Sequence, residues 1–164
     1  MGRKAIELGA TGRTVAANIA FFRAKREWRL AQLSERMTEV GRPMTVNTLS
    51  AIENLDRRTD VDDLMAIAAA LDVSPASLLM PRIEDDDDED GGIAWHVATS
   101  AEPDPGDQGV ALVSGQLWDW LVADAPLREP LYTDTGRDEF EVEAWRRKQV
   151  PPFAHRKRPG ERRD

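Results

Sequence analysis

The sequence predicts a mainly α-helical protein, with a five-helix domain over residues 13–83, an acidic linker over 84–92 and a small, less regular C-terminal segment over 93–148. Three observations support this division. Apolar residues recur every three or four positions through the first half, residues that start or stop helices separate these runs, and seven consecutive acids divide the two halves. Residues 1–12 are expected to form an N-terminal arm, and residues 149–164 a flexible basic tail.

The first two helices follow from apolar spacing. Over residues 14–26, Val15 and Ile19 recur at the interval that places side chains on one face of a helix. A second apolar stripe covers residues 30–40. Gly41 follows it directly and supplies a stop, because glycine adopts the left-handed conformation that often ends a helix.

Three further helices are predicted from their capping residues. Thr45 is a candidate N-cap for the third helix, and Asp60 is one for the fourth, because their side-chain oxygens can accept a bond from a backbone N–H in the first turn. Val61 is expected on the inward face of the fourth helix. Ser74 followed by Pro75 is a cap followed by proline at the first helical position, which opens a short fifth helix.

Cysteine is absent from the 164 residues, which excludes disulfides, zinc fingers and thiol catalysis and is typical of a reducing cytoplasm. The only histidines, His96 and His155, lie in separate polar segments without the spacing of a metal site or a nucleophile pair. No apolar run approaches the roughly 18–20 residues that cross a bilayer. We therefore expect a cytoplasmic protein that is not an enzyme, carries no metal or cofactor and has no membrane partner.

The net charge of −8 is unevenly distributed along the chain. Residues 1–83 carry 12 basic and 10 acidic side chains, whereas residues 84–164 carry 10 basic and 20 acidic ones. The negative total would count against a nucleic-acid partner, but the first half is mildly basic. The acidic run itself repels its neighbours and cannot bury apolar area, so it is predicted to be a solvated linker.

The C-terminal segment is predicted to contain one strand and one or two helices. Residues 93–98 alternate enough for a strand, and residues 114–123 and 138–148 show helical spacing. Four of the five tryptophans fall in this segment: Trp95, Trp118, Trp120 and Trp145. Aromatic rings at this density require burial, either within the chain or against a second subunit or partner, and both alternatives stay open.

Several ordered pieces of the first half resemble one family. They are NIAFFRAKREW, LSERM, TLSAIEN, VDDLMAIAAALDVS and PASLLMP, in this order between Val15 and Pro81. This stretch resembles the repressor/Cro-type (XRE) helix-turn-helix DNA-binding family, in a style similar to small regulators of actinobacteria and their phages. The resemblance implies a repressor-like domain in which helix three, about residues 45–54, lies in the major groove.

The resemblance also assigns site residues. The outward positions of helix three would read base edges, and they are Thr45, Val46, Asn47, Thr48, Ser50 and Ala51. Asn47 is the strongest base reader, because its amide can pair bidentately with adenine. Residues flanking the reading helix would contact phosphates, and they are Arg29, Arg42, Asn54, Arg57 and Arg58. Arg23 and Glu53 occupy positions that form an internal ion pair in the family, which implies a structural role.

Several features depart from the family pattern, among them Leu30 at the position that usually holds a phosphate-binding glutamine and Trp28 where a leucine packs. Glu27 stands where a glycine often ends helix one, and Leu55 and Asp56 replace a common glycine-lysine pair after helix three. The segment from Thr38 to Met44 also makes the connection between helices two and three longer than usual. The acid after helix three lies near the expected path of the phosphates.

Together these residues predict a sequence-specific DNA-binding transcriptional regulator, expected to act as a repressor, whose partner is double-stranded DNA. Homodimerisation through the Trp-rich C-terminal segment would bury its aromatic rings. The alternative is a protein-interaction module, such as an antitoxin or accessory factor, that docks a partner through the Trp-rich half.

Overall fold

The computed structural model divides into two units, residues 1–114 and residues 115–164. It describes residues 8–82, 93–94, 112–127, 132–133, 136–137 and 139–155. The predicted acidic linker, Trp95, His96 and residues 156–164 of the predicted tail lie outside the described residues.

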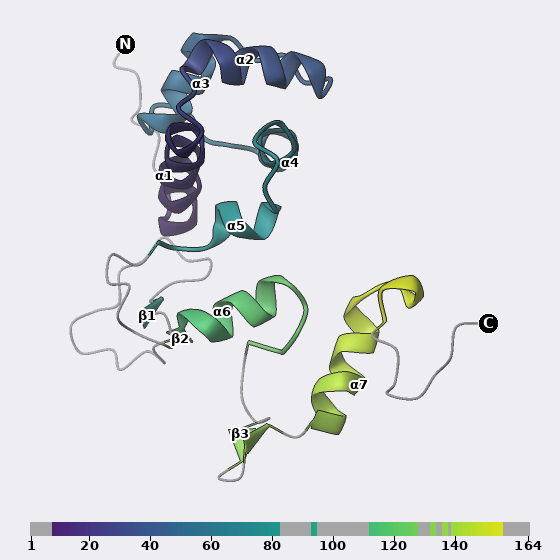
Figure 1. Cartoon of the computed structure of the whole chain (residues 1–164). Coiled ribbons are helices and arrows are strands. Elements are labelled where there is room, and N and C mark those ends of the chain that lie inside the picture. Colours follow the sequence, from purple (N-terminus) through teal and green to yellow (C-terminus); the bar gives the residue numbers. More distant parts are fainter. Residues whose placement is uncertain are drawn as a thin grey trace, which may run out of the picture. The chain divides into compact units, whose positions relative to one another are not determined.

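Five helices make up residues 8–82, as the capping and spacing pattern predicted (Figure 1). They are α1 (Ala10–Lys25), α2 (Leu30–Glu39), α3 (Val46–Glu53), α4 (Val61–Ala70) and α5 (Pro75–Leu79). The N-caps at Thr45, Asp60 and Ser74 each accept a backbone N–H from the first turn. These side chains satisfy donors that the helix itself leaves unpaired.

The start of α1 differs from the expectation of an arm over residues 1–12. The helix begins at Ala10, so the last three residues of that range are helical. Apolar spacing alone placed the start near residue 14, because the first turn contains no core side chain. That turn is held instead by Arg13, whose backbone N–H bonds to Gly9 O and whose Nη1 donates to Leu8 O at 2.7 Å.

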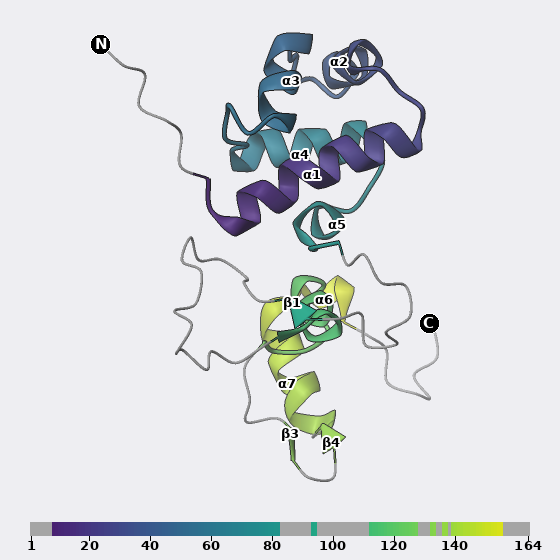
Figure 2. The ribbon, with the colours of Figure 1, turned by 90° about the vertical axis from the view of Figure 1, so that its left-hand side faces the viewer.

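The core of this domain joins all five helices. Figure 2 shows α2 and α3 on one side of the domain and α5 on the other, with α1 running between them. The fully buried apolar side chains are Ile19, Leu33, Met37, Leu49, Ile52, Ile67, Leu71 and Leu78. Val61 does not join them and is 75% exposed, so its expected inward position was wrong. It is the first residue of α4, one position after the cap, and the inward position of that first turn is taken by Asp63.

Within the five-helix domain, four residues that follow helix ends adopt positive φ angles. Gly41 does so after α2, with φ of 84°, and glycine carries no steric penalty there. Glu27, Leu55 and Asp72 do so after α1, α3 and α4, with φ of 58°, 65° and 50°. Glu27 and Leu55 are the positions at which this sequence lacks a glycine that is common in the family. The backbone therefore keeps the left-handed conformation at these helix ends, although the Cβ atom of a residue other than glycine makes this conformation strained.

Asn18 fastens the end of the domain to α1. Its side chain is buried, and its Nδ2 donates to the carbonyl oxygens of Ser77, Leu78 and Met80 at 3.3, 3.0 and 2.7 Å. A short helix leaves its last carbonyls without intrahelical donors. One amide of α1 therefore supplies the donor that the end of α5 lacks.

Outside the five-helix domain the structure describes short elements. In the first unit, β1 (Ile93–Ala94) pairs antiparallel with β2 (Leu112–Val113). α6 (Ser114–Leu121) follows β2 directly, and all of it except Ser114 belongs to the second unit. The second unit contains β3 (Tyr132–Thr133) paired antiparallel with β4 (Gly136–Arg137), then α7 (Glu139–Gln149) and a 3-10 turn, η1 (Pro152–Ala154). The two C-terminal helices match the spacing of the sequence, and β1 covers the first two residues of the strand predicted over 93–98, whose other residues lie outside the described part. The sequence did not predict β2, β3 or β4. Among the described residues no helix is long and apolar enough to span a membrane.

The described part of the second unit has few buried residues. Leu117 and Ala125 are buried, and Arg146 Nε of α7 lies 3.4 Å from Asp124 Oδ1. Trp118 and Trp120 are 38% and 37% exposed. These two rings thus keep over a third of their surface uncovered in the single chain.

Candidate nucleic-acid interface

Two of the predicted base readers form hydrogen bonds to each other at the start of α3. The Thr45 hydroxyl accepts the Thr48 backbone N–H at 3.2 Å, and the two hydroxyl oxygens lie 3.0 Å apart. This cap fixes where α3 starts. Both hydroxyl groups already have hydrogen-bond partners at the start of α3, so their capacity to discriminate bases is reduced.

The last turn of α3 contains a second side-chain contact. Asn54, the C-cap, donates from Nδ2 to Ser50 Oγ at 3.1 Å. Ser50 is partly buried and Asn54 is exposed. The contact orients the Asn54 amide along the outer side of the helix, beside a position predicted to face DNA.

Asn47 has the most available polar end among the outward residues of α3. Its side chain is exposed and makes no hydrogen bond to any residue within the described range 8–82. Val46 beside it is also exposed, whereas Ala51 is half-buried. An exposed amide next to an exposed branched aliphatic side chain offers one polar and one apolar contact to a base-pair edge.

An ion pair fixes the inner side of α3 to α1. Arg23 Nε and Nη2 donate to Glu53 Oε1 and Oε2, each at 2.7 Å, and Arg23 Nη1 donates to Trp28 O at 2.7 Å. The bond to Glu53 raises the pKa of Arg23 above its usual value. A bidentate guanidinium–carboxylate pair also fixes the relative angle of its two groups. Arg23 thereby connects α1, α3 and the turn before α2.

The connection between α2 and α3 is held at two points. Met44 is buried in the core, and its carbonyl accepts the hydroxyl of Ser34 in α2. The Arg42 backbone N–H bonds to Met37 O at 3.0 Å. The long segment seen in the sequence is thus a structured connection, whose Arg42 side chain is directed toward α4.

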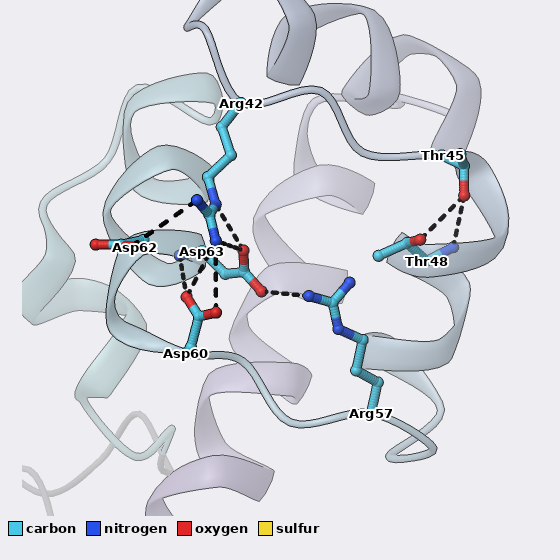
Figure 3. A network of polar contacts seen from close by, with 7 residues as sticks. All are labelled: Arg42, Thr45, Thr48, Arg57, Asp60, Asp62 and Asp63. Atoms are coloured by element: carbon cyan, nitrogen blue, oxygen red, sulfur yellow. Dashed lines mark hydrogen bonds and ion pairs between the residues drawn. The ribbon is translucent and has the colours of Figure 1, made fainter.

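The first turn of α4 gathers a group of charged residues that we call the Asp63 cluster, which comprises Arg42, Arg57, Asp60, Asp62 and Asp63 (Figure 3). Asp63 is only 1% exposed. Its Oδ1 accepts Arg42 Nε at 2.7 Å, its Oδ2 accepts Arg57 Nη2 at 2.8 Å, and its backbone N–H donates to the Asp60 cap at 2.7 Å.

The remaining members of the Asp63 cluster hold Arg42 more weakly. Arg42 Nη2 lies 3.4 Å from the Asp60 carboxylate, and Nη1 lies 3.9 Å from Asp62 Oδ2. These carboxylates, Asp63 foremost, raise the pKa of Arg42 above its usual value. All three acids face Arg42, and no described group of three histidine or acidic side chains is arranged to hold a metal ion.

The Asp63 cluster changes the interpretation of two predicted phosphate contacts. Arg42 and Arg57 lie on either side of α3, as expected, but both guanidinium groups are paired with Asp63. The resemblance implied phosphate contacts for both arginines because they flank the helix that reads the bases. The signal that could have revealed Asp63 is its position four residues before the core residue Ile67, on the buried face of α4.

The other predicted phosphate residues are exposed. Arg29 is the N-cap of α2, and its backbone N–H donates to Gln32 Oε1 at 2.7 Å. The Arg29 guanidinium makes no hydrogen bond or ion pair with any residue of the five-helix domain that the structure describes. Arg58 and Asn54 are likewise exposed, on the segment that follows α3.

Comparison with known proteins supports this reading of the domain. Residues 19–78, from the middle of α1 to the next-to-last residue of α5, match the model of a helix-turn-helix family. No curated protein and no solved structure matches the chain significantly. The family match agrees with the order of the five helices and with the capped start of α3. Residues 19–78 thus form a helix-turn-helix domain that is similar to the Cro/XRE-type DNA-binding regulators.

Proposed function

We propose that the protein is a sequence-specific transcriptional repressor that reads the major groove of double-stranded DNA with α3. The observation that carries the proposal is the outer surface of α3, where Asn47 presents an exposed amide without a partner in the described domain. A helix-turn-helix domain places the N-terminal side chains of this helix at base edges.

The side chains of α3 favour a site that contains A·T pairs. The amide of Asn47 can donate to adenine N7 and accept from adenine N6, and the neighbouring Val46 can contact a thymine methyl group. Thr45, Thr48 and Ser50 contribute less discrimination, because their hydroxyls already have partners in α3.

Phosphate contacts supply the remaining affinity. We assign them to Arg29, Asn54 and Arg58, which are exposed at the start of α2 and on the segment that follows α3. Each basic contact that neutralises a phosphate releases counterions, so the affinity falls as salt rises. Of these three residues only Arg29 and Arg58 carry a positive charge, so two domains on two half-sites would neutralise about four phosphates and give a moderate dependence of binding on salt.

Dimerisation and repression are the finer parts of the proposal. Trp118 and Trp120 each keep over a third of their surface exposed, and a second copy of the chain could cover them. A dimer would read two half-sites about one helical turn apart. Repression needs no further activity, since a protein bound at a promoter excludes polymerase by occupancy.

Selection of bound duplexes from a random DNA pool tests the proposal directly. We expect the full-length chain to enrich one sequence that contains A·T steps, with two symmetric half-sites if the protein is a dimer. Enrichment of no sequence above the starting pool would overturn sequence-specific binding. Sedimentation at high micromolar concentration checks the dimer, and a monomer with an asymmetric site would exclude it.

A second candidate function rests on the second unit. Phe140 and Phe153 are 81% and 91% exposed, and a protein partner could cover both rings. On this reading the protein is an interaction module, such as an antitoxin. A salt titration of binding to random duplex separates the two functions, because weak binding that is independent of salt favours a protein partner.

A further inference from the structure

The Asp63 cluster joins three segments that are separate in the sequence. Arg42 lies in the connection before α3, Arg57 in the connection after it, and Asp63 in the first turn of α4. One carboxylate therefore bridges the two chain segments that enter and leave α3, with one oxygen for each arginine (Figure 3).

We propose that Asp63 is a positioning residue for DNA recognition, which holds both ends of α3 so that its outer side chains meet the base edges in one fixed orientation. The inference rests on the proposed function of α3. It assigns to Arg42 and Arg57 the role of clamping α3 and leaves the phosphates to other residues.

The burial of Asp63 makes this clamp stiff. An ionised carboxylate that is 1% exposed must keep its partners, because leaving it unpaired in the protein interior is costly. Two charge-assisted bonds of 2.7 and 2.8 Å satisfy its two oxygens. The outer parts of Arg42 and Arg57 reach solvent, so the clamp spans from the buried end of α4 to the surface around α3.

The length of the connection explains why a clamp is needed. In this family a tight turn usually joins the second and third helices, and this turn by itself limits their relative movement. Here six residues, from Val40 to Thr45, separate α2 from α3. The core residue Met44 anchors the end of this connection, and Arg42 anchors its middle through Asp63.

A clamp and a phosphate contact differ in what their loss does to binding. Loss of a phosphate contact weakens all DNA sequences alike and reduces the salt slope by about one. Loss of the clamp leaves the basic groups in place and releases α3, so affinity for the selected site falls while affinity for random DNA is kept. The ratio of the two affinities therefore reports positioning.

The test compares Asp63→Asn with Asp62→Asn in the full-length chain. Both variants remove one negative charge from the same turn, but Asp62 is exposed and lies 3.9 Å from Arg42. Binding to the sequence selected by the wild-type chain and to random duplex is measured for both. We expect Asp63→Asn to lose at least about tenfold in affinity for the selected site with no loss on random duplex, and Asp62→Asn to change neither by more than about threefold.

Equal changes in the two affinities of a folded Asp63→Asn variant would overturn the inference while leaving the proposed function intact. Failure of the wild-type chain to select any sequence would overturn both. If circular dichroism shows that Asp63→Asn does not fold, Arg57→Gln decides. A selective loss on the chosen site with an unchanged salt slope supports the clamp, and a uniform loss with a reduced slope contradicts it.

Discussion

The inner and outer faces of α3 differ in what they contact. Leu49 and Ile52 on the inner face are fully buried, and Glu53 is paired with Arg23. Val46 and Asn47 on the outer face are exposed. The helix has eight residues, so side chains that hold the domain together stand next to side chains available to a ligand.

This difference separates stability from recognition. A change on the inner face should alter the free energy of unfolding, and a change on the outer face should alter the free energy of binding alone. Substitutions on and around α3 can test whether the two faces are independent.

Leu49→Ala should destabilise the domain by about 2–5 kcal/mol, because it removes buried methyl groups and leaves a cavity among residues of the core. Urea denaturation followed by circular dichroism measures the change. Val46→Ala is the control on the outer face and should cost less than about 0.5 kcal/mol. Similar losses in both variants would show that the faces are not distinct.

Glu53→Gln should destabilise the domain by about 2 kcal/mol, since Arg23 would lose the charge of its bidentate partner. This figure is below the value for a fully buried pair because solvent screens the part of the pair that is exposed. Glu35→Gln is the matched control, with the same charge change at an exposed position of α2. A thermal melt that gives equal midpoints for the two variants would remove the structural role of the pair.

Asn47→Ala should leave unfolding unchanged and cost about 1–3 kcal/mol of binding free energy at one base step of the selected site. Competition with duplexes altered one pair at a time locates the step. An unchanged ratio between selected and random DNA would show that Asn47 does not read a base.

Arg58→Ala should weaken binding to all sequences by a similar factor and lower the salt slope by about one. The physical reason is that a phosphate contact carries no sequence information. Measurement of the dissociation constant at four salt concentrations, on selected and random duplex, checks it. A loss confined to the selected site would show that Arg58 contacts a base edge and not the phosphate backbone.

Glu27→Gly should stabilise the domain by about 0.5–1 kcal/mol, because glycine adopts a φ of 58° without steric strain. The control, Glu35→Gly, places glycine within a helix and should cost about 1 kcal/mol. Opposite signs in a denaturation experiment would confirm that the left-handed end of α1 bears strain.

The helices and their caps could be predicted from the sequence because the signals are local. Thr45 and Asp60 each act within one turn, and Glu27 and Leu55 follow the ends of their helices at positions where the family often has glycine. The partner of Arg42 could not be predicted in this way. It lies 21 residues further along the chain, and only the packing of α4 brings the two side chains together.

The single amide of Asn18 has a practical consequence for where the folding unit ends. The family match stops at residue 78, yet the shortest bond from Asn18 goes to the carbonyl of Met80. A fragment cut at the limit of the match would lack that acceptor and the last residue of α5, Leu79. A fragment that continues to Arg82 would keep it, so an autonomous version for fusion or crystallisation should be cut there and not at the last residue that the family shares.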